Sequence, residues 1–402
     1  MTNLPQGWKM ETLGEILSSD KYSIKRGPFG SALKKSFFVE KGIRIFEQYN
    51  PINNDPHWKR YFISHEKFQE LEAFKATEGD LLISCSGTLG KIVELPKDTE
   101  MGIINQALLK IRLNNIKILN SYFIYYFNSP IMQEKILEST LGSAIKNIAN
   151  VKILKQIEIP LPPLKEQERI VGILDESFAK IDESIKILEQ DLLNLDELMQ
   201  SALQKAFNPL KDNAKENYKL PQSWEWKSLE EISENISAGG DKPKNCTESK
   251  TAKNQIPVYA NGVNNNGLVG YTDKATIIKP SLTISARGTI GFVCIRKEPY
   301  FPIVRLISLI PCENILCLHY LYFCLNFFIA KGEGSSIPQL TIPKFKSLQI
   351  PLPPLKEQEQ IAEHLDFVFE KAKALKELYT KELKDYEELK QSLLNKAFKG
   401  EL

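Results

Sequence analysis

The ten residues IPLPPLKEQE occur twice in this chain of 402 residues, at 159–168 and again at 350–359, without a single change. A long helical pattern follows each copy. The two patterns close with QSALQKAF (200–207) and QSLLNKAF (391–398), which keep the same separation of 191 positions. A separation that stays constant over some fifty residues indicates a duplicated segment rather than a chance match.

Weaker matches precede both copies. LPQGWKMETLGEI (4–16) matches LPQSWEWKSLEEI (220–232), and ISCSGTLG (83–90) matches ISARGTIG (284–291). The separations differ, so residues have been gained and lost between the matches. The duplication predicts an α+β fold, in which two pseudo-two-fold-related α/β domains are each followed by a long helix.

The repeats divide the chain into four expected domains: globular units at 1–158 and 209–349, and helices at 159–208 and 350–402. The formal net charge of the whole chain is only +2. The globular units carry +4 and +5, whereas the helices carry −5 and −2. Basic globular units suit a polyanionic partner, although charges of this size are weak evidence alone.

The pattern after each repeat predicts a coiled coil between the two helices. Pro162 and Pro163 suit the first turn of a helix, where a missing N–H costs nothing. From 171 to 206 apolar residues recur at alternating steps of three and four, which is a heptad seam. Lys376 and Lys390 interrupt the second seam and disfavour pairing of two copies of that helix. The two helices are therefore expected to pair with each other; the alternative is that each packs on its own globular unit.

Helix length predicts the direction of the pairing. A helix over 165–207 would be about 65 Å long at roughly 1.5 Å per residue. The second globular unit must link the end of one helix to the start of the next, and its radius of gyration is roughly 14 Å. Parallel helices would strain that link. We therefore expect an antiparallel coiled coil.

Composition excludes several classes of protein. Apolar content of 42% and charged content of 25% are typical of a soluble globular protein. The N-terminal MTNLPQGWKM is not a secretory signal, and the densest apolar run (318–330) is too short to span a bilayer, so a cytoplasmic location without membrane contact is expected. The six cysteines lack C-x-x-C spacing and the four histidines are scattered, which predicts reduced core thiols and no metal site.

No catalytic motif stands out. SGTLGKI (86–92) lacks the spacing of a phosphate-binding loop, so a turn at the end of a strand is expected. LPPL (161–164 and 352–355) resembles the proline pair of adenine methyltransferases, but leucine replaces the Asp or Asn that would bind the amino group. We therefore expect no catalytic residues and no cofactor, and a chain that recognises rather than reacts.

Basic side chains near glycines and aromatic residues are the candidates for contact with nucleic acid. Glycine lets the backbone approach a phosphate, and a basic side chain neutralises it. For each residue the alternative is a solvated turn, and Trp8 and Trp224 are expected to be core anchors. The candidate DNA-binding residues are Lys25, Arg26, Lys34, Lys35, Lys59, Arg60, Lys242, Lys244, Tyr259 and Arg287.

An opening LPxxW, a central ISxxGTxG and IPLPPLxEQ before a long helix, all occurring twice, together resemble the specificity (S) subunit of type I restriction–modification systems. The resemblance covers essentially the whole chain. It implies two target recognition domains that each read one half of a split DNA sequence. It also implies an antiparallel coiled coil that sets the gap, two modification (M) subunits that methylate adenine, and restriction (R) subunits that join for cleavage. The family's S subunit has no catalytic residues.

Two other functions remain open from the sequence. A non-catalytic scaffold could bind RNA or protein through the basic units, and salt-dependent, sequence-preferring binding to duplex DNA would distinguish the two readings. A catalytic methyltransferase is disfavoured by the missing motifs. The target bases are not encoded in any pattern that can be read from the chain.

Overall fold

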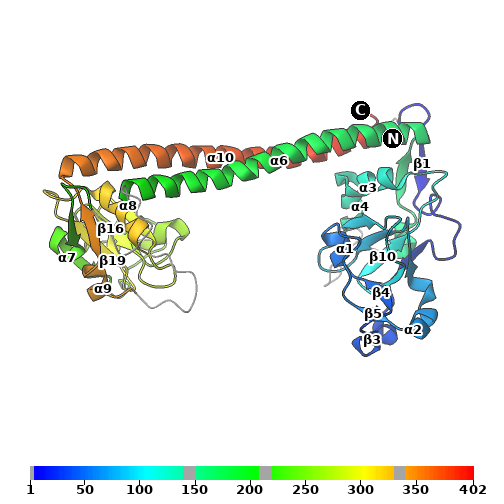
Figure 1. Cartoon of the computed structure of the whole chain (residues 1–402), viewed down its shortest axis with the longest axis horizontal. Coiled ribbons are helices and arrows are strands. Elements are labelled where there is room, and N and C mark those ends of the chain that lie inside the picture. Colours follow the sequence, from blue (N-terminus) through cyan, green and yellow to red (C-terminus); the bar gives the residue numbers. More distant parts are fainter. Residues whose placement is uncertain (1–3, 139–147, 149, 208–219, 330–339) are drawn as a thin grey trace. The chain divides into compact units, whose positions relative to one another are not determined.

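Contacts divide the chain, seen here as a computed structural model, into two compact units (Figure 1). Unit 1 comprises Met1–Leu188 with Lys381–Leu402, and unit 2 comprises Glu189–Thr380. Each unit holds a globular part and segments of both long helices, α6 (Leu164–Phe207) and α10 (Leu355–Lys399). The structure describes residues 4–138, 148, 150–207, 220–329 and 340–402, so the expected domain boundary at 208 lies outside them.

Two sheets form the globular part of unit 1. The first is antiparallel, in the order β2 (Ile24–Arg26), β10 (Leu108–Ile111), β7 (Leu81–Ser84), β8 (Ile92–Glu94). The second has the order β3 (Phe38–Val39), β5 (Phe62–Ile63), β4 (Ile43–Phe46), β9 (Gly102–Ile104), β6 (Lys75–Ala76). Within the second sheet β4 and β9 run parallel, while the other pairs are antiparallel.

Helices cover the first sheet and complete the core of unit 1. Tyr122, Phe123 and Tyr126 of α3 are fully buried, and the hydroxyl of Tyr122 donates to the carbonyl oxygen of Pro160 at 2.8 Å. The helices are α1 (Tyr49–Ile52), α2 (His65–Glu70), α3 (Asn120–Asn128), α4 (Pro130–Glu138) and α5 (Val151–Leu154). The 3-10 helices are η1 (Gly30–Ala32), η2 (Lys35–Phe37) and η3 (Glu72–Phe74).

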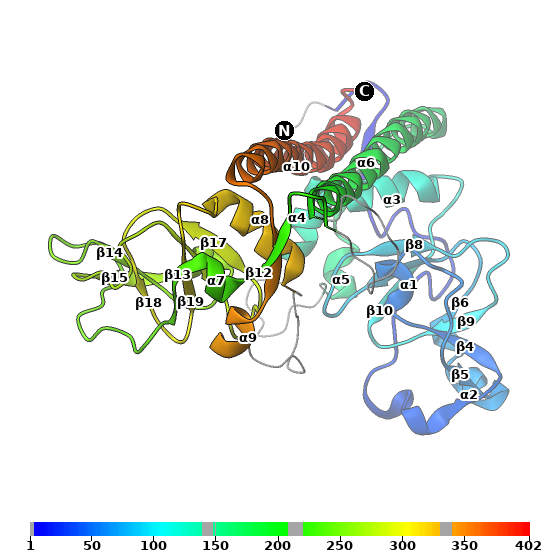
Figure 2. The ribbon, with the colours of Figure 1, turned by 60° about the vertical axis from the view of Figure 1, so that its left-hand side comes forward.

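Unit 2 repeats this architecture with other residues (Figure 2). Its four-stranded sheet has the order β13 (Ser233–Ala238), β19 (Ile307–Pro311), β16 (Ser281–Ile284), β17 (Val293–Arg296). Its three-stranded sheet has the order β15 (Leu268–Thr272), β14 (Ile256–Tyr259), β18 (Phe301–Pro302), and β14 and β18 run parallel. The helices are α7 (Leu229–Ile232), η4 (Asn264–Gly267), α8 (Leu318–Phe328) and α9 (Ile342–Lys346).

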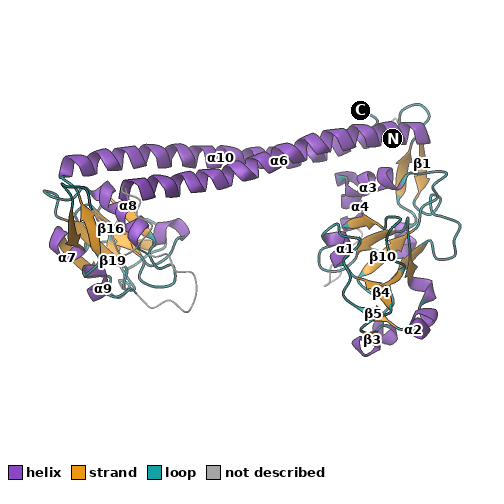
Figure 3. Cartoon of the chain, viewed as in Figure 1, coloured by secondary structure: helices purple, strands orange, loops and turns teal. Residues whose placement is uncertain are grey.

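The repeated decapeptide begins as a strand in both units (Figure 3). β11 (Glu158–Leu161) pairs with β1 (Lys9–Thr12), and β20 (Gln349–Leu352) pairs with β12 (Glu225–Ser228). Pro162 and Pro163 follow the strand, and α6 begins only at Leu164. Residues 159–161, which precede the two prolines, use their backbone groups in the β-ladder with β1.

Helices α6 and α10 pack together in antiparallel fashion within each unit, which confirms the predicted helix pair. In unit 1, Lys390 forms an ion pair with Asp182 at 2.6 Å, and Arg169 donates to the carbonyl oxygen of Leu402 at 2.8 Å. In unit 2, Lys376 forms an ion pair with Asp196. The early residues of α6 thus meet the late residues of α10, and each lysine of the interrupted seam meets an aspartate.

The ends of both helices also pack on the globular cores, as the alternative expectation had it. In unit 1, Leu174 of α6 and Phe398 of α10 belong to the same buried cluster as the side chains of α3. In unit 2, Phe207 of α6 and Leu365 of α10 join the cluster around α8. Near the ends of the helices, pairing and docking therefore occur together; Phe178 of α6, for example, contacts both Lys390 of α10 and Tyr125 of α3.

The tryptophans and cysteines give mixed results. Trp224 is buried and Trp8 packs against the core of unit 1, so both are anchors as predicted. All six cysteines are free, but only Cys85 and Cys324 are buried, so the prediction of core thiols was wrong for the other four. In the described part of the chain, no helix has the length and apolarity to cross a membrane, and no three metal-ligating side chains gather.

Candidate nucleic-acid interface

The parallel strands β4 and β9 of unit 1 end side by side. Glu47 and Gln48 follow β4, and Asn105 and Gln106 follow β9. The amide of Asn105 donates to the carbonyl oxygen of Phe46 at 3.0 Å, which holds the two strand ends together. Loops beyond the carboxyl ends of parallel strands are a common place for ligand contacts. Four polar side chains therefore gather at one edge of the sheet.

A glycine brings a third loop to this edge. A Cβ atom on Gly27 would lie 1.8 Å from the carbonyl oxygen of Asn105, so only glycine allows the close approach. Two residues later, Phe29 is 66% exposed, and the guanidinium of Arg26 lies 5.5 Å from the centroid of its ring. An exposed aromatic ring beside an arginine suits stacking on a base or a sugar.

The turn after β7 completes the cluster. The amide of Cys85 donates to the carbonyl oxygen of Ala107 at 2.8 Å, and the turn at 86–89 leads into β8. This confirms the prediction of a turn at the end of a strand for SGTLGKI. We call residues 27–29, 47–50, 85–89 and 105–107 the loop cluster of unit 1.

Unit 2 carries the corresponding cluster: residues 239–240, 259–262, 285–288 and 303–305. Tyr259 of β14 is in register with Pro302 of β18, so the loops after both strands again start at one edge. Asn261 joins three of the loops. Its Oδ1 accepts from the amide of Ala286 at 2.8 Å, and its Nδ2 donates to the carbonyl oxygen of Val304 at 2.6 Å.

The fourth loop of unit 2 approaches through Gly239, which occupies the place that Gly27 has in unit 1. A Cβ atom on Gly239 would lie 2.6 Å from the amide nitrogen of Ile303. The neighbouring Val304 and Arg305 have φ of 54° and 60°, in the left-handed region that side chains rarely adopt. Their amides donate to Gly240 O and Gly239 O, both at 2.8 Å. Backbone strain of this kind is concentrated at functional sites.

The basic residues predicted in unit 1 are distributed over several places. Lys25 and Arg26 lie in β2 rather than in a loop. The ammonium of Lys25 lies 5.0 Å from the ring centroid of Phe74. Lys34 and Lys35 are exposed around η2. Of these four residues, Arg26 is the one that the structure places directly beside the loop cluster.

Lys59 and Arg60 lie on a loop that Arg44 supports from inside. The buried guanidinium of Arg44 donates to the carbonyl oxygens of Pro56 and Trp58 at 2.9 and 2.7 Å. Lys59 is ion-paired with Glu100 at 3.0 Å. Burial raises the pKa of the Glu47 carboxyl above its ordinary value, and the positive charge of the exposed Arg60 opposes this rise in part.

The predicted residues of unit 2 separate into exposed and packed groups. Lys242 and Lys244 are exposed just beyond Gly240, and Arg287 is exposed at the turn after β16. Tyr259 instead packs inside the unit, where the guanidinium of Arg296 lies 3.5 Å from its ring centroid. The structure thus gives Tyr259 a packing role and leaves the three basic side chains at the surface.

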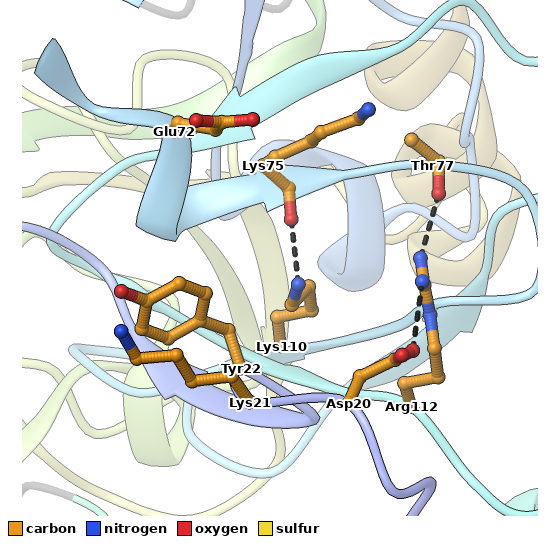
Figure 4. A pocket seen from close by; sticks show the side chains of 8 residues that line it. All are labelled: Asp20, Lys21, Tyr22, Glu72, Lys75, Thr77, Lys110 and Arg112. Atoms are coloured by element: carbon orange, nitrogen blue, oxygen red, sulfur yellow. Dashed lines mark hydrogen bonds and ion pairs between the residues drawn. The ribbon is translucent and has the colours of Figure 1, made fainter. Parts of the chain in front are cut away.

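A second polar site in unit 1 lies beyond the other end of β10 and was not predicted. It is a cavity of about 400 Å³ around Lys110 and Arg112 (Figure 4). The buried ammonium of Lys110 donates to Lys75 O at 2.6 Å, and burial lowers its pKa. Arg112 is ion-paired with Asp80 at 2.8 Å and with Asp20 at 3.2 Å. These charges compensate one another within the unit.

Sequence reasoning missed Glu47, Gln48, Asn105 and Gln106. The search was for positive charge, and none of these side chains is basic. A usable signal was present in IRIFEQ (43–48) and GIINQ (102–106), where an apolar run typical of a strand stops at a polar pair. Val304 and Arg305 gave no comparable signal, because nothing in their residue types predicts the left-handed backbone.

Comparison with known proteins agrees with the duplicated architecture. The family described as type I restriction modification DNA specificity domain matches residues 5–192 and 221–384. A putative type I specificity subunit of Mycoplasma pneumoniae, S.MpnORF507P, is 34% identical over 56% of this chain and 58% of its own length. The putative MjaX specificity subunit of Methanocaldococcus jannaschii is 25% identical over 85% of this chain and 82% of its own length.

A solved chain has the same fold. It comes from a structure titled for complex assembly and conformational transition of the type I R-M system, and it is 20% identical, with a TM-score of 0.81 over all of both chains. The alignment with the Mycoplasma relative leaves about two fifths of that protein unmatched.

Proposed function

The chain belongs to the type I restriction modification DNA specificity family, and we propose that it reads a bipartite DNA target for a type I restriction–modification complex. The observation that carries the proposal is the loop cluster that occurs once in each unit, at the carboxyl ends of parallel strands. Two similar but non-identical readers on one chain would recognise two different half-sites. The target therefore need not be palindromic.

In this proposal the regions 1–158 and 209–349 are the target recognition domains. Exposed basic residues beside the loop clusters, such as Arg60, Lys242 and Arg287, would neutralise phosphates and position the domain on duplex DNA. Polar side chains within the clusters would contact base edges. Phosphate contacts supply affinity and base contacts supply sequence preference.

We propose that the regions 159–208 and 350–402 fix the gap between half-sites and dock two methyltransferase subunits. Restriction subunits would join the same complex for cleavage. The chain would contribute recognition and leave the chemistry to these partners, in the cytoplasm, where the DNA is. It would need no cofactor of its own, since methyl transfer and cleavage belong to the M and R subunits.

The test is adenine-methylation mapping in cells that express the chain with its methyltransferase partner. We expect methylation at a split motif, with two short specified halves and a fixed unspecified gap. Cells with the methyltransferase subunit but without this chain are the control and should lack that motif. The proposal would be contradicted if methylation were the same with and without this chain, or if the methylated motif were a single contiguous sequence.

A further inference from the structure

Two side chains in the loop cluster of unit 1 hold oxygen atoms without a hydrogen-bond partner. Among the residues that the structure describes, Glu47 Oε2 and Gln48 Oε1 are shielded from solvent and accept no hydrogen bond from another protein group. The two side chains are otherwise partly exposed. An acceptor left in this state costs roughly 1–3 kcal/mol, so such atoms are rare in folded proteins. Because both side chains are otherwise partly exposed, a rotation of either one would bring its acceptor to the surface, where a donor of a bound partner could reach it.

The backbone that presents Glu47 and Gln48 is held firmly. The amide of Glu47 donates to Asn50 Oδ1 at 2.9 Å, and the buried Asn50 donates to Asp55 O and Trp58 O, both at 2.8 Å. A reader needs such support, because base discrimination depends on side chains that are held in place before binding.

The chemistry of this pair suits a base edge and opposes a phosphate. A carboxylate is repelled by a phosphate but accepts a hydrogen bond from an exocyclic amino group, cytosine N4 or adenine N6, in the major groove. A glutamine side chain both donates and accepts, and it pairs well with adenine. The exposed Gln106 lies on the neighbouring loop and adds a second amide to the same surface.

Unit 2 lacks this arrangement at the corresponding loop. Ala260 and Asn261 stand where unit 1 has Glu47 and Gln48, since Tyr259 and Phe46 end the matching strands. Both polar atoms of the Asn261 amide are used to join loops of the unit. The loop after the first parallel strand is thus a support in unit 2 and has free acceptors in unit 1.

We infer that Glu47 and Gln48 determine the base specificity of unit 1 by accepting a hydrogen bond from a cytosine or adenine amino group in the major groove. This inference rests on the proposed function and adds residues and a ligand chemistry to it. The half-site that unit 1 reads contains one position at which the amino-bearing base is required, and the half-site of unit 2 does not depend on these residues.

The test compares methylation motifs of the wild-type complex with those of Glu47→Gln and Gln48→Met, two changes that nearly preserve side-chain length. Glu78→Gln is the matched control, since Glu78 is exposed in the turn before β7, at the end opposite to the loop cluster. For Glu47→Gln we expect discrimination at one position of one half-site to fall about ten-fold. The other half-site reports that the variant is folded and should be unchanged.

The identity of the relaxed position distinguishes cytosine from adenine as the base that Glu47 reads. If both variants keep the wild-type motif in full, Glu47 and Gln48 do not read a base and the inference is overturned. If both half-sites weaken equally, the side chains act on assembly or stability instead, which also overturns it. Failure of the proposed function would look different, because the wild-type complex would then show no split motif.

Discussion

The two units are nearly the same where the repeat enters the helix and differ at their loop clusters. Buried Gln167 donates to Lys117 O and Pro162 O and accepts from the amide of Leu119, each at 2.9 Å. Buried Gln358 makes the corresponding three bonds in unit 2, to Ile315 O, to Pro353 O and from the amide of Cys317, at 2.8–2.9 Å.

This match explains why both copies of the decapeptide carry a glutamine at this position. Its glutamine ties three elements together, namely the helix, the prolines that precede it and the loop before α3 or α8. Backbone groups are the same for every residue type, so a side chain that serves them has little freedom to vary. The loop clusters serve an external partner, and there Glu47 and Gln48 have given way to Ala260 and Asn261. We call the segment where the repeat enters the helix, with Gln167 or Gln358 at its centre, the frame, and the two loop clusters the readers. The frame is constant between the units, whereas the readers vary.

The largest expected effect is on the frame. Gln167→Leu removes the partners of three backbone groups and should lower the free energy of unfolding by about 3 kcal/mol. Gln358→Leu should cost unit 2 a similar amount, because its bonds are equivalent. Urea unfolding followed by circular dichroism measures both. Gln360→Leu, at an exposed position of α10, is the control and should change stability little. Unequal costs in the two units would break the idea of a common frame.

The next effect concerns the glycines that bring a loop against the parallel strands. Gly27→Ala would place a Cβ atom 1.8 Å from a carbonyl oxygen, and Gly239→Ala would place one 2.6 Å from an amide nitrogen. We expect losses of about 2 kcal/mol for Gly27→Ala and less for Gly239→Ala, since overpacking costs roughly 1–3 kcal/mol. Gly172→Ala, in open space on α6, is the matched control and should stabilise the helix by about 1 kcal/mol. If alanine at 27 cost no more stability than alanine at 172, Gly27 would not lie as close to the carbonyl oxygen of Asn105 as the structure shows.

The frame could be predicted from the sequence, whereas the loop clusters could be predicted only in part. The duplicated frame was visible because its residues recur at constant separation. The heptad pattern with two lysines predicted a pair of unlike helices, and helix length predicted that they run antiparallel. The strand that precedes the prolines was not predicted, because its partner β1 lies some 150 positions earlier in the chain. The loop clusters were only partly predictable. Whether a polar residue has a partner depends on contacts between distant loops, as with Asn261 and Val304, and positive charge alone did not identify them.

A smaller effect is expected where the two helices meet. The side chain of Lys390 is 17% exposed and that of Lys376 is 29% exposed, and their aspartate partners are both largely solvated. A double-mutant cycle with Asp182→Ala and Lys390→Ala should give a coupling of about 1 kcal/mol in unit 1. The cycle at Asp196 and Lys376 should give less, because the second lysine is more exposed. Both couplings should fall as salt is added. A coupling of zero in both cycles would show that the lysines are merely tolerated in the seam.

The smallest expected effect is a gain in stability rather than a loss, on replacing Glu47 in the loop cluster of unit 1. It tests most directly whether Glu47 belongs to a reader or to the frame. Burial raises the pKa of Glu47, so between its ordinary value and the raised value the folded state binds more protons than the unfolded chain. Stability from this group is therefore lost as the pH rises through that window, and at pH 7 the ionised carboxylate opposes folding. Glu47→Gln should raise the free energy of unfolding at pH 7 by at most about 0.5 kcal/mol, since the side chain is partly exposed.

Urea titrations of wild type and Glu47→Gln at pH 7 and at pH 4 measure this difference, and the gain should shrink at pH 4, where wild-type Glu47 takes up its proton. Glu78→Gln, at an exposed position, should show no such pH-dependent gain. Replacing a side chain that stabilises the frame, such as Gln167, should lower the free energy of unfolding. Replacing a side chain that serves a bound base should raise it, because in the free protein the acceptor has no donor and is destabilising. A loss of stability in Glu47→Gln at pH 7 would place Glu47 with the frame and remove it from the readers.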